Sequence, residues 1–411
     1  MKQTIEQHKR WKDDPSKGEV FTPVELVNEM LDKIPSSVWE NPNSLFLDPC
    51  MGKGTFLVEI IKRLVYIYGY SKEDAMSRVY GYDTRIKYIN HLKRGGFVNV
   101  FRKDFLIEEF NMKFDVVIGN PPYQKTQESK GKRGGGDTLW DKFVIKSLND
   151  VIKDGGYLCF IHPTLWRKPQ SERSSSKDVN KLMMKKQIHY LEMHSSDDGM
   201  KTFNAGTRYD WYIIENTDTY KPTIINGEDR VDVEVDLRSY SFIPNYGLEF
   251  FNRLLVKNNE ECCPIIFNAS NYETRKQYVN EIQTEEFMYP LIHSTPKNGT
   301  RYMYSSMNDK GHFGIPKVIF GDSGIYDVII DVDGEYGMTQ HSMAIKIESV
   351  IEGNLIKQVL LSESFTEFLK TCMWSNFQID WRLFTYLKKD FWKYFLDEDN
   401  NTIVTNFGNV R

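Results

Sequence analysis

A predicted strand that runs directly into two prolines is the most informative local feature of the sequence. Residues 114–119 (FDVVIG) are apolar enough for a buried strand, and Asn120-Pro121-Pro122-Tyr123 follows at once. Because proline lacks a backbone N–H and fixes its own φ, the strand must end there. Asn120 and Tyr123 are then left on a stiff turn at the carboxyl end of a strand, where open α/β sheets bind ligands. A plain strand-ending turn is the alternative.

The groups on this turn are suited to activating the exocyclic amine of a nucleobase. Such an amine is a poor nucleophile because its lone pair is delocalised into the ring. Two acceptors, the Asn120 Oδ1 and the Pro121 carbonyl, would draw the nitrogen towards tetrahedral geometry and localise that pair for attack on a methyl group. Tyr123 offers a ring face on which a base extruded from a duplex can stack. This chemistry needs no metal, and we expect no metal site.

Two other strand ends predict a nucleoside site. The strand predicted at 44–49 leads into a loop with Gly52 and Gly54, which let the backbone approach a ligand, and then into a helix whose N-terminal dipole points there. The strand at 78–83 ends in Asp83, a carboxylate that can accept both hydroxyls of a ribose. A third glycine and a G-K-[ST] sequence are missing, which disfavours a dinucleotide and a triphosphate.

A third predicted strand, 97–101, is followed by Asp104 and Phe105. In a doubly wound sheet its carboxyl end lies beside the first two, so an adenine ring there can contact Phe105 and donate from its amine to Asp104. Core packing is an equal alternative for Phe105, and a helix cap is the alternative for Asp104.

The elements that position these groups follow from the spacing of apolar residues. Val27, Met30, Leu31 and Ile34 predict a helix over 24–34, begun by a capping box at Thr22-Pro23-Val24-Glu25. A second helix is predicted over 57–67, and later strands at 156–161, 187–193 and 209–215. Strands separated by helical crossovers predict a mostly parallel α/β sheet covered on both faces.

The 411 residues fit two domains better than one. From about residue 222 short strands and turns replace the earlier alternation, and an aromatic-rich helical segment follows at 362–396. We therefore predict an α/β domain at 1–225 and a mixed α+β domain at 226–411. Residues 1–220 hold 34 basic and 30 acidic side chains, a net +4, whereas the rest hold 19 and 27, a net −8.

The number and spacing of the cysteines, together with the hydropathy of the sequence, indicate the cellular compartment. The five cysteines are odd in number and form no C-x-x-C pair, which predicts reduced cytosolic thiols and no zinc site. No apolar run reaches the roughly 18 residues of a membrane span, and the polar N-terminus lacks the apolar stretch of a signal peptide. We expect a cytoplasmic protein without a membrane partner.

Taken in order, the motifs resemble those of DNA adenine-N6 methyltransferases, and are similar to the methylase parts of type I and type IIG restriction-modification systems. They are Gly-Glu-Val-Phe-Thr-Pro (18–23), Asp-Pro-x-x-Gly-x-Gly-Thr-Phe (48–56), Tyr-Gly-Tyr-Asp (80–83), Lys-Asp-Phe (103–105) and Asn-Pro-Pro-Tyr (120–123). The likeness covers residues 15–215. It implies a Rossmann-like, doubly wound methyltransferase sheet, followed by a target-recognition domain.

The resemblance also implies a role for particular residues. S-adenosylmethionine would be held by Phe21, Thr22, Pro23, Asp48, Pro49, Gly52, Gly54, Thr55 and Phe56, with Asp83 on its ribose and Asp104 and Phe105 on its adenine. Asn120, Pro121, Pro122 and Tyr123 fall on the catalytic positions. Residues 50–53 read Cys-Met-Gly-Lys where relatives commonly have Ala-Cys-Gly-Ser, so Lys53 stands beside a sulfonium cofactor.

Several substrates share this chemistry. Asn-Pro-Pro-Tyr also occurs in methyltransferases of protein glutamine and of ribosomal RNA, whereas cytosine-N4 enzymes more often begin the motif with Ser. A DNA-binding module with an inactive catalytic fold is an alternative from another class, although every motif residue is intact. The Phe-Thr-Pro segment and the long region after the catalytic domain favour adenine in double-stranded DNA.

The interpretation as a DNA methyltransferase also predicts which residues contact DNA and which partner protein is expected. Candidate DNA contacts are Lys125, Lys130, Lys132 and Arg133 after the catalytic turn, and Lys297 and Arg301 in the segment 293–306. A solvated surface is the alternative for each. The stretch before Phe-Thr-Pro is too short for a nuclease domain, so we expect a methylase alone, with any restriction endonuclease encoded separately.

Overall fold

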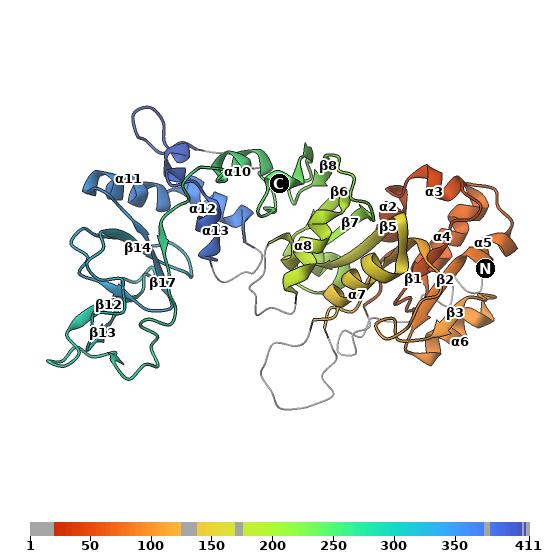
Figure 1. Ribbon diagram of the computed structural model, residues 1–411, viewed down its shortest axis with the longest axis horizontal. Coiled ribbons are helices and arrows are strands. Elements are labelled where there is room, and N and C mark those ends of the chain that lie inside the picture. Colours follow the sequence, from red (N-terminus) through yellow and green to blue (C-terminus); the bar gives the residue numbers. More distant parts are fainter. Residues whose placement is uncertain (1–19, 125–137, 169–175, 374–378, 405–406, 408–411) are drawn as a thin grey trace. The chain divides into compact units, whose positions relative to one another are not determined.

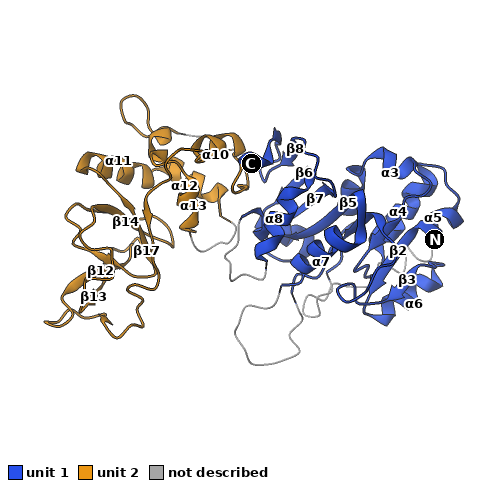
Figure 2. Cartoon of the chain, in the orientation of Figure 1, with its two compact units in different colours: residues 1–239 blue, residues 240–411 orange. Residues whose placement is uncertain are grey.

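The computed structural model describes residues 20–124, 138–168, 176–373, 379–404 and 407. The chain divides into two compact units, unit 1 (residues 1–239) and unit 2 (residues 240–411) (Figure 2). This division lies later than the predicted boundary at 225/226. The physical reason is that the two strands after residue 222 pair with the sheet of unit 1 and extend it.

Unit 1 is built on a nine-stranded sheet with the strand order β3-β2-β1-β4-β5-β7-β6-β8-β9 (Figure 1). The strands are β1 (Phe46–Asp48), β2 (Val79–Asp83), β3 (Val100–Arg102), β4 (Phe114–Gly119), β5 (Ile152–Pro163), β6 (Gln187–His194), β7 (Tyr209–Glu215), β8 (Thr223–Asn226) and β9 (Asp232–Val235). Strands β3, β2, β1, β4 and β5 are parallel, whereas β7 lies antiparallel between β5 and β6. The predicted α/β class is confirmed.

Helices cover both faces of this sheet. Phe46 and Leu47 are neighbours on β1 and therefore point to opposite faces, and both are fully buried. The helices of unit 1 are α2 (Val24–Asp32), α3 (Ser36–Glu40), α4 (Thr55–Tyr66), α5 (Lys72–Arg78), α6 (Ile86–Arg94), α7 (Trp140–Lys146), α8 (Lys177–Lys185) and α9 (Ser196–Phe203). A π-helix, η2 (Ser147–Val151), and two 3-10 helices, η3 (Thr164–Arg167) and η4 (Leu237–Ser239), complete the unit.

The strand order reverses at β1. The chain passes outward from β1 to β2 and β3, and then returns to place β4 on the other side of β1. The carboxyl ends of β1 and β4 are therefore adjacent, which makes their edge the topological switch point where such sheets bind ligands. Asp48 ends β1 and Asn120 follows β4, so the fold brings the motif at 48–56 and the motif at 120–123 together.

The start of α2 differs from the prediction. Helix α2 begins at Val24 as expected, but Pro23 is its N-cap and no side chain caps it. The predicted capping box at Thr22 is therefore not formed. Thr22 bonds instead to the turn after β4, as described below.

Unit 2 contains two four-stranded sheets, of order β10-β17-β14-β15 and β11-β13-β12-β16. Their strands are β10 (Ile265–Ile266), β11 (Val279–Asn280), β12 (Tyr289–Ser294), β13 (Arg301–Ser305), β14 (Lys317–Gly321), β15 (Ile329–Asp331), β16 (Gly337–Met338) and β17 (Ser342–Lys346). The helices are α10 (Leu248–Leu254), α11 (Val350–Leu360), α12 (Glu363–Thr371), α13 (Arg382–Tyr386) and the 3-10 helix η5 (Phe391–Phe395). Mixed α+β structure is as predicted, although the aromatic segment forms several short helices.

Across the described residues of both units, every helix is too short or too polar to cross a lipid bilayer.

Candidate active site

Asp48 is a buried carboxylate at the end of β1. Its side chain is 1 % exposed, and its Oδ1 accepts a hydrogen bond from the Cys50 N at 3.0 Å. The backbone of Gly119 passes so close that a Cβ there would lie 2.8 Å from this oxygen. Burial, with a further contribution from the Asp83 carboxylate, raises the pKa of Asp48 to about 8. A bound cation would favour the charged form of Asp48.

The loop after β1 needs its two glycines. Gly52 has a φ of +50° and Gly54, the N-cap of α4, a φ of +83°, both in the left-handed region that favours glycine. A Cβ at Gly54 would lie 2.6 Å from a Leu92 methyl carbon. The Gly52 N donates to the Asp83 Oδ2 at 3.0 Å, so the glycine loop and the end of β2 form one polar cradle.

Asp83 already has several donors. Its Oδ1 accepts from the N and the Nε of Arg85, at 2.9 and 3.0 Å, in addition to the bond from Gly52 to Oδ2. A ribose hydroxyl that binds this carboxylate would share it with the partly exposed side chain of Arg85.

The Phe-Thr-Pro segment lies against the glycine loop. The Phe21 ring would be 3.4 Å from a Cβ at Gly52, and the Lys53 Nζ sits 4.4 Å from the centre of the same ring. Tyr88 of α6 meets Phe21 edge to face. Phe21 thus lies against Gly52 and Lys53, which are distant from it in sequence.

The catalytic turn is tied to the same segment. The Asn120 Nδ2 donates a hydrogen bond to the Thr22 Oγ1 at 3.3 Å. Because the amide nitrogen is held, the Asn120 Oδ1 is left to accept from a ligand. Pro121 is buried, while Pro122 and Tyr123 are half-buried. This bond, between residues 98 positions apart, explains why Thr22 does not cap α2.

A buried ion pair stands beside the turn, and sequence reasoning missed it. Asp210 of β7 and Arg167 of η3 are both 0 % exposed, and the Arg167 Nε lies 3.0 Å from the Asp210 Oδ2. The Trp166 Nε1 donates to the same oxygen at 2.8 Å. Burial raises the pKa of Asp210 to about 6 despite the Arg167 charge. A charged residue within the apolar strand 209–215 was the available signal, because buried charges require partners.

Tyr123 adjoins this pair. Burial raises the pKa of the Tyr123 hydroxyl far above its usual value, and the nearby Tyr209 and Asp210 raise it further. Within the described part of the chain, neither the Tyr123 hydroxyl nor the Asp210 Oδ1 has a hydrogen-bond partner. Buried polar atoms left unsatisfied in this way are uncommon and often accompany functional sites.

The remaining predicted cofactor residues divide into buried and exposed ones. Phe105 is 1 % exposed and stacks on Phe143 of α7 at 5.0 Å, so the core-packing alternative describes it and no exposed face remains for an adenine. Asp104 is exposed, and its Oδ1 accepts from the Leu106 N, which makes it the cap of a turn at the carboxyl edge. Thr55 begins α4, while Pro49 and Phe56 are buried.

The predicted DNA contacts fall in different places. Lys125, Lys130, Lys132 and Arg133 lie outside the described residues. Lys297 and Arg301 are exposed in unit 2, with the Lys297 Nζ above the Tyr326 ring. Among the described side chains, no group of His, Cys, Asp and Glu could hold a metal ion.

A segment that includes much of this edge of the sheet matches a known protein family. Residues 53–198 match the Eco57I restriction-modification methylase family. The Eco57I match spans the ends of β2 and β3 and the turn at 120–123. The predicted resemblance to restriction-modification methylases is thereby confirmed.

Curated relatives are similar over part of their length. The type II methyltransferase M.VspI of Vibrio sp. (strain 343) is 28 % identical over 160 residues, which cover 35 % of this chain and 36 % of that protein. An adenine-specific methylase of Mycoplasma pneumoniae is 23 % identical over 38 % of this chain and 57 % of that protein. The modification methylase CviBIII of Paramecium bursaria Chlorella virus NC1A is 25 % identical over 70 % and 73 %. The chain thus spans about a third to three quarters of these relatives.

S-adenosylmethionine is the cofactor that the Eco57I-type match implies, and the residues present fit it. Asp48 is a buried carboxylate that a sulfonium or ammonium group would stabilise, and Asp83 supplies acceptors for hydroxyls. Gly52 keeps the backbone open beside the Phe21 ring, where a Cβ would come into contact. The fit of the cofactor therefore rests on the charge of Asp48, the hydrogen-bond acceptors of Asp83 and the space beside Gly52.

Proposed function

We propose that the chain is a site-specific DNA methyltransferase, which transfers a methyl group from S-adenosylmethionine to the N6 amine of an adenine flipped out of duplex DNA. The observation that carries the proposal is the bond from Asn120 to Thr22 at the switch point between β1 and β4. It orients an amide oxygen on a proline-stiffened turn, beside the buried carboxylate of Asp48.

The chain's own groups would act on the amine. The Asn120 Oδ1 and the Pro121 carbonyl accept its two hydrogens, which localises the nitrogen lone pair towards the methyl group. S-adenosylmethionine supplies that methyl group, whose bond to sulfur breaks as the bond to nitrogen forms. The nitrogen, then positively charged, releases one proton to water. Asp48 and Asp83 hold the cofactor, and the Tyr123 ring stacks on the flipped base.

Duplex DNA is the proposed partner, and a restriction endonuclease would be a separate chain. Lys297 and Arg301 are proposed DNA contacts because both are exposed cations. Similarity to proteins named as type II and adenine-specific methylases supports DNA adenine over RNA or protein glutamine.

The proposal is tested by expressing the chain in a host whose DNA lacks N6-methyladenine and sequencing that DNA for the modified base. Wild type should methylate one defined sequence, and Asn120→Ala should not. Thr22→Val, which removes only the orienting bond, should fall between them, whereas Thr22→Ser should behave as wild type. Equal methylation by wild type and Asn120→Ala would refute the proposed mechanism.

A further inference from the structure

Asp141, in the first turn of α7, is a fully buried carboxylate that none of the sequence motifs includes. We propose that Asp141 is a positioning residue for methyl transfer, which holds the exit of the catalytic turn (residues 120–123) so that the Tyr123 ring faces the flipped base. This role rests on the proposed function and deepens it. Asp141 acts through Tyr123 and does not itself contact the substrate.

The exit of the catalytic turn is joined to the start of α7 through the backbone. The Tyr123 carbonyl accepts a hydrogen bond from the Leu139 N at 3.1 Å. Gln124 and Thr138 pair as an isolated antiparallel bridge. Because these bonds connect the backbone after Pro122 to that of residues 138 and 139, whatever holds Thr138 also holds Tyr123.

The Asp141 carboxylate holds Thr138 and connects it to a second helix. Its Oδ2 accepts from the Thr138 Oγ1 at 2.8 Å and from the Ser176 Oγ at 2.7 Å. Ser176 is the N-cap of α8 and stands 35 positions after Asp141 in sequence. Hydrogen bonds to an ionised acceptor are roughly twice as strong as neutral ones. Asp141 therefore ties the exit of the turn firmly to the start of α8.

Helix α8 is anchored in turn to the buried ion pair beside Tyr123. The Asn180 Nδ2 of α8 donates to the Trp166 carbonyl at 2.8 Å. The Trp166 Nε1 donates to the Asp210 Oδ2 at 2.8 Å, and Asp210 lies near the Tyr123 hydroxyl. The series of bonds that begins at the Tyr123 carbonyl thus returns to the surroundings of the Tyr123 side chain.

The orientation of Tyr123 needs a restraint that the prolines do not supply. Pro121 and Pro122 fix their own φ angles in the middle of the turn. Tyr123 is an ordinary residue whose backbone has a wide allowed region. A displacement of about 1 Å in a group that orients a substrate can lower a reaction rate by about 10²-fold. The bonds from Asp141 supply the missing restraint at the exit of the turn.

The first test uses the free protein and needs no DNA. In Asp141→Ala, the Leu139 amide should exchange with deuterium roughly 10- to 100-fold faster than in wild type, because the bonds that hold the exit are weakened. Mass spectrometry of peptides that contain Leu139 measures this rate. Thr138→Val removes the bonded hydroxyl but keeps the shape and should have the same effect, whereas Thr138→Ser should exchange as wild type does.

The second test measures methyl transfer. Asp141→Ala should lower kcat by about 10- to 100-fold and leave the KM for S-adenosylmethionine unchanged, because the turn positions the base and the cofactor lies at the ends of β1 and β2. In a Tyr123→Ala background the same substitution should lower kcat by less than about twofold more, because its effect passes through the Tyr123 ring.

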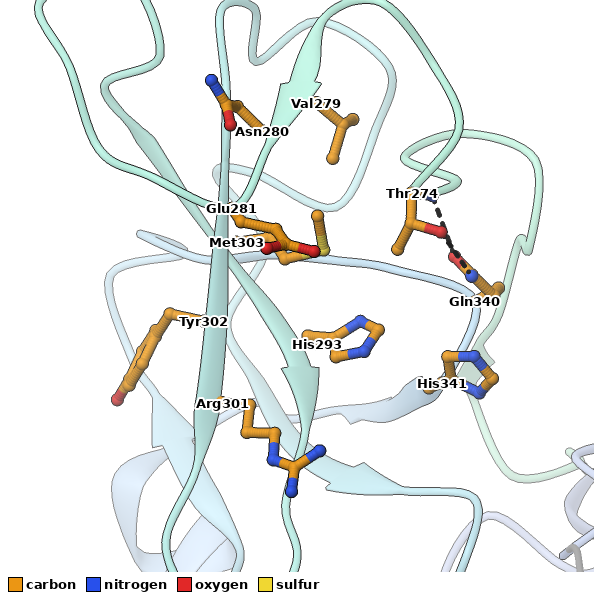
Figure 3. A pocket seen from close by; sticks show the side chains of 10 residues that line it. All are labelled: Thr274, Val279, Asn280, Glu281, His293, Arg301, Tyr302, Met303, Gln340 and His341. Carbon is orange, nitrogen blue, oxygen red and sulfur yellow. Dashed lines mark hydrogen bonds between the residues drawn. The ribbon is translucent and has the colours of Figure 1, made fainter.

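Two variants serve as controls. Asp115→Ala removes a carboxylate from the opposite end of β4, where it bonds to Lys153. Gln340→Ala breaks a comparable link in unit 2, where the Gln340 Oε1 accepts from the Thr274 N at 3.2 Å and its Nε2 donates to the Thr274 Oγ1 at 3.0 Å, as the dashed lines in Figure 3 mark. Both variants should keep the wild-type exchange rate at Leu139.

Three outcomes would overturn the inference. One is unchanged exchange at Leu139 in folded Asp141→Ala, or in Thr138→Val should the first variant not fold, as thermal unfolding shows. Another is an equal fall in kcat with and without the Tyr123 ring, which would place the action of Asp141 elsewhere. The third is an equal acceleration of exchange in Asp115→Ala, which would make the effect one of general stability.

Failure of the proposed function is distinguishable from failure of this inference. If wild type methylates no DNA while Asp141→Ala still releases the Leu139 amide, the proposed function fails and the positioning of the turn by Asp141 stands.

Discussion

Two buried ion pairs, one in each unit, differ in how completely their polar atoms are satisfied. In unit 2 the Lys317 Nζ donates to the Asp331 Oδ2 and to the carbonyls of His312 and Ile315, and Asp331 also accepts from two backbone N–H groups. In unit 1 the Arg167–Asp210 pair leaves the Asp210 Oδ1 without a partner among the described residues.

This difference in hydrogen bonding indicates that the Lys317–Asp331 pair is structural, whereas the Arg167–Asp210 pair belongs to a functional site. Lys317 and Asp331 satisfy one another and nearby backbone groups inside unit 2, so the charged atoms of this pair have their hydrogen bonds without a ligand. The Asp210 Oδ1 and the Tyr123 hydroxyl, neither of which has a hydrogen-bond partner in the described ranges, lie close together at the catalytic turn. Unsatisfied buried groups cost stability, which a fold tolerates where function uses them.

The largest effect is expected from breaking the satisfied pair. Lys317→Met should lower the free energy of unfolding by about 3–5 kcal/mol, because Asp331 is left as a buried charge without its partner. Denaturant unfolding measures this, and Lys370→Met, at an exposed position, should change stability by less than about 0.5 kcal/mol. A loss no larger than that of the control would contradict a structural role for the pair.

The next effect concerns chemistry rather than stability. Asn120→Ala should lower kcat for methyl transfer by about 10²–10³-fold, because the amide oxygen acts only on the developing charge of the amine. Steady-state kinetics and an unfolding curve separate the two effects, since the Asn120 side chain is half-buried and its loss should leave the fold intact. An Asn120→Ala variant with lowered stability and unchanged kcat would contradict this prediction.

The protonation state of Asp48 should make both the stability of the protein and its affinity for the cofactor depend on pH. Its pKa of about 8 in the folded protein exceeds its ordinary value of 3.8, so its contribution to stability is complete below pH 4 and is lost as pH rises through 8. A cationic cofactor binds the charged form, so its affinity should rise about tenfold from pH 6 to pH 7. Calorimetric titration measures this rise, which should be absent in Asp48→Asn.

The smallest effect compares two tyrosines. Tyr123→Phe removes a buried hydroxyl that has no hydrogen-bond partner within the part of the chain that the structure describes, and it should raise the free energy of unfolding by about 1 kcal/mol. Tyr272→Phe is the matched control in unit 2, where the hydroxyl accepts from the Lys310 N, and it should lower that free energy by about 1 kcal/mol. If both substitutions changed the free energy of unfolding in the same direction, the proposed distinction between the two hydroxyls would be contradicted.

Much of unit 1 could be predicted because its signals are local. The strand at 114–119 is found at the predicted residues, and the strands ending in Asp48 and Asp83 lie within a residue or two of their predicted bounds. Apolar runs stopped by glycine or proline depend on backbone geometry, which neighbours in sequence decide. The predicted site residues at the ends of these strands, Asp48, Asp83 and Asn120, therefore fall on one edge of the sheet.

The misses all involve partners distant in sequence. Thr22 matches a capping pattern, yet it bonds to Asn120. Phe105 was equally suited to a ligand or the core, and its partner Phe143 lies on a later helix. Lys317 is a lysine that local sequence would place at the surface, yet it is buried because Asp331, a carboxylate of the next strand, neutralises it.

The sequence by itself determined where strands end and which residue types stand at those ends, because proline, glycine and apolar spacing act on the nearest peptide units. Only the tertiary structure decided which of these groups are oriented for chemistry. The switch point between β1 and β4 brings Thr22 to Asn120, and the pairing of β5 with β7 sets Asp210 beside Tyr123. Hydrogen bonds across such distances in sequence depend on packing, and no local pattern encodes them.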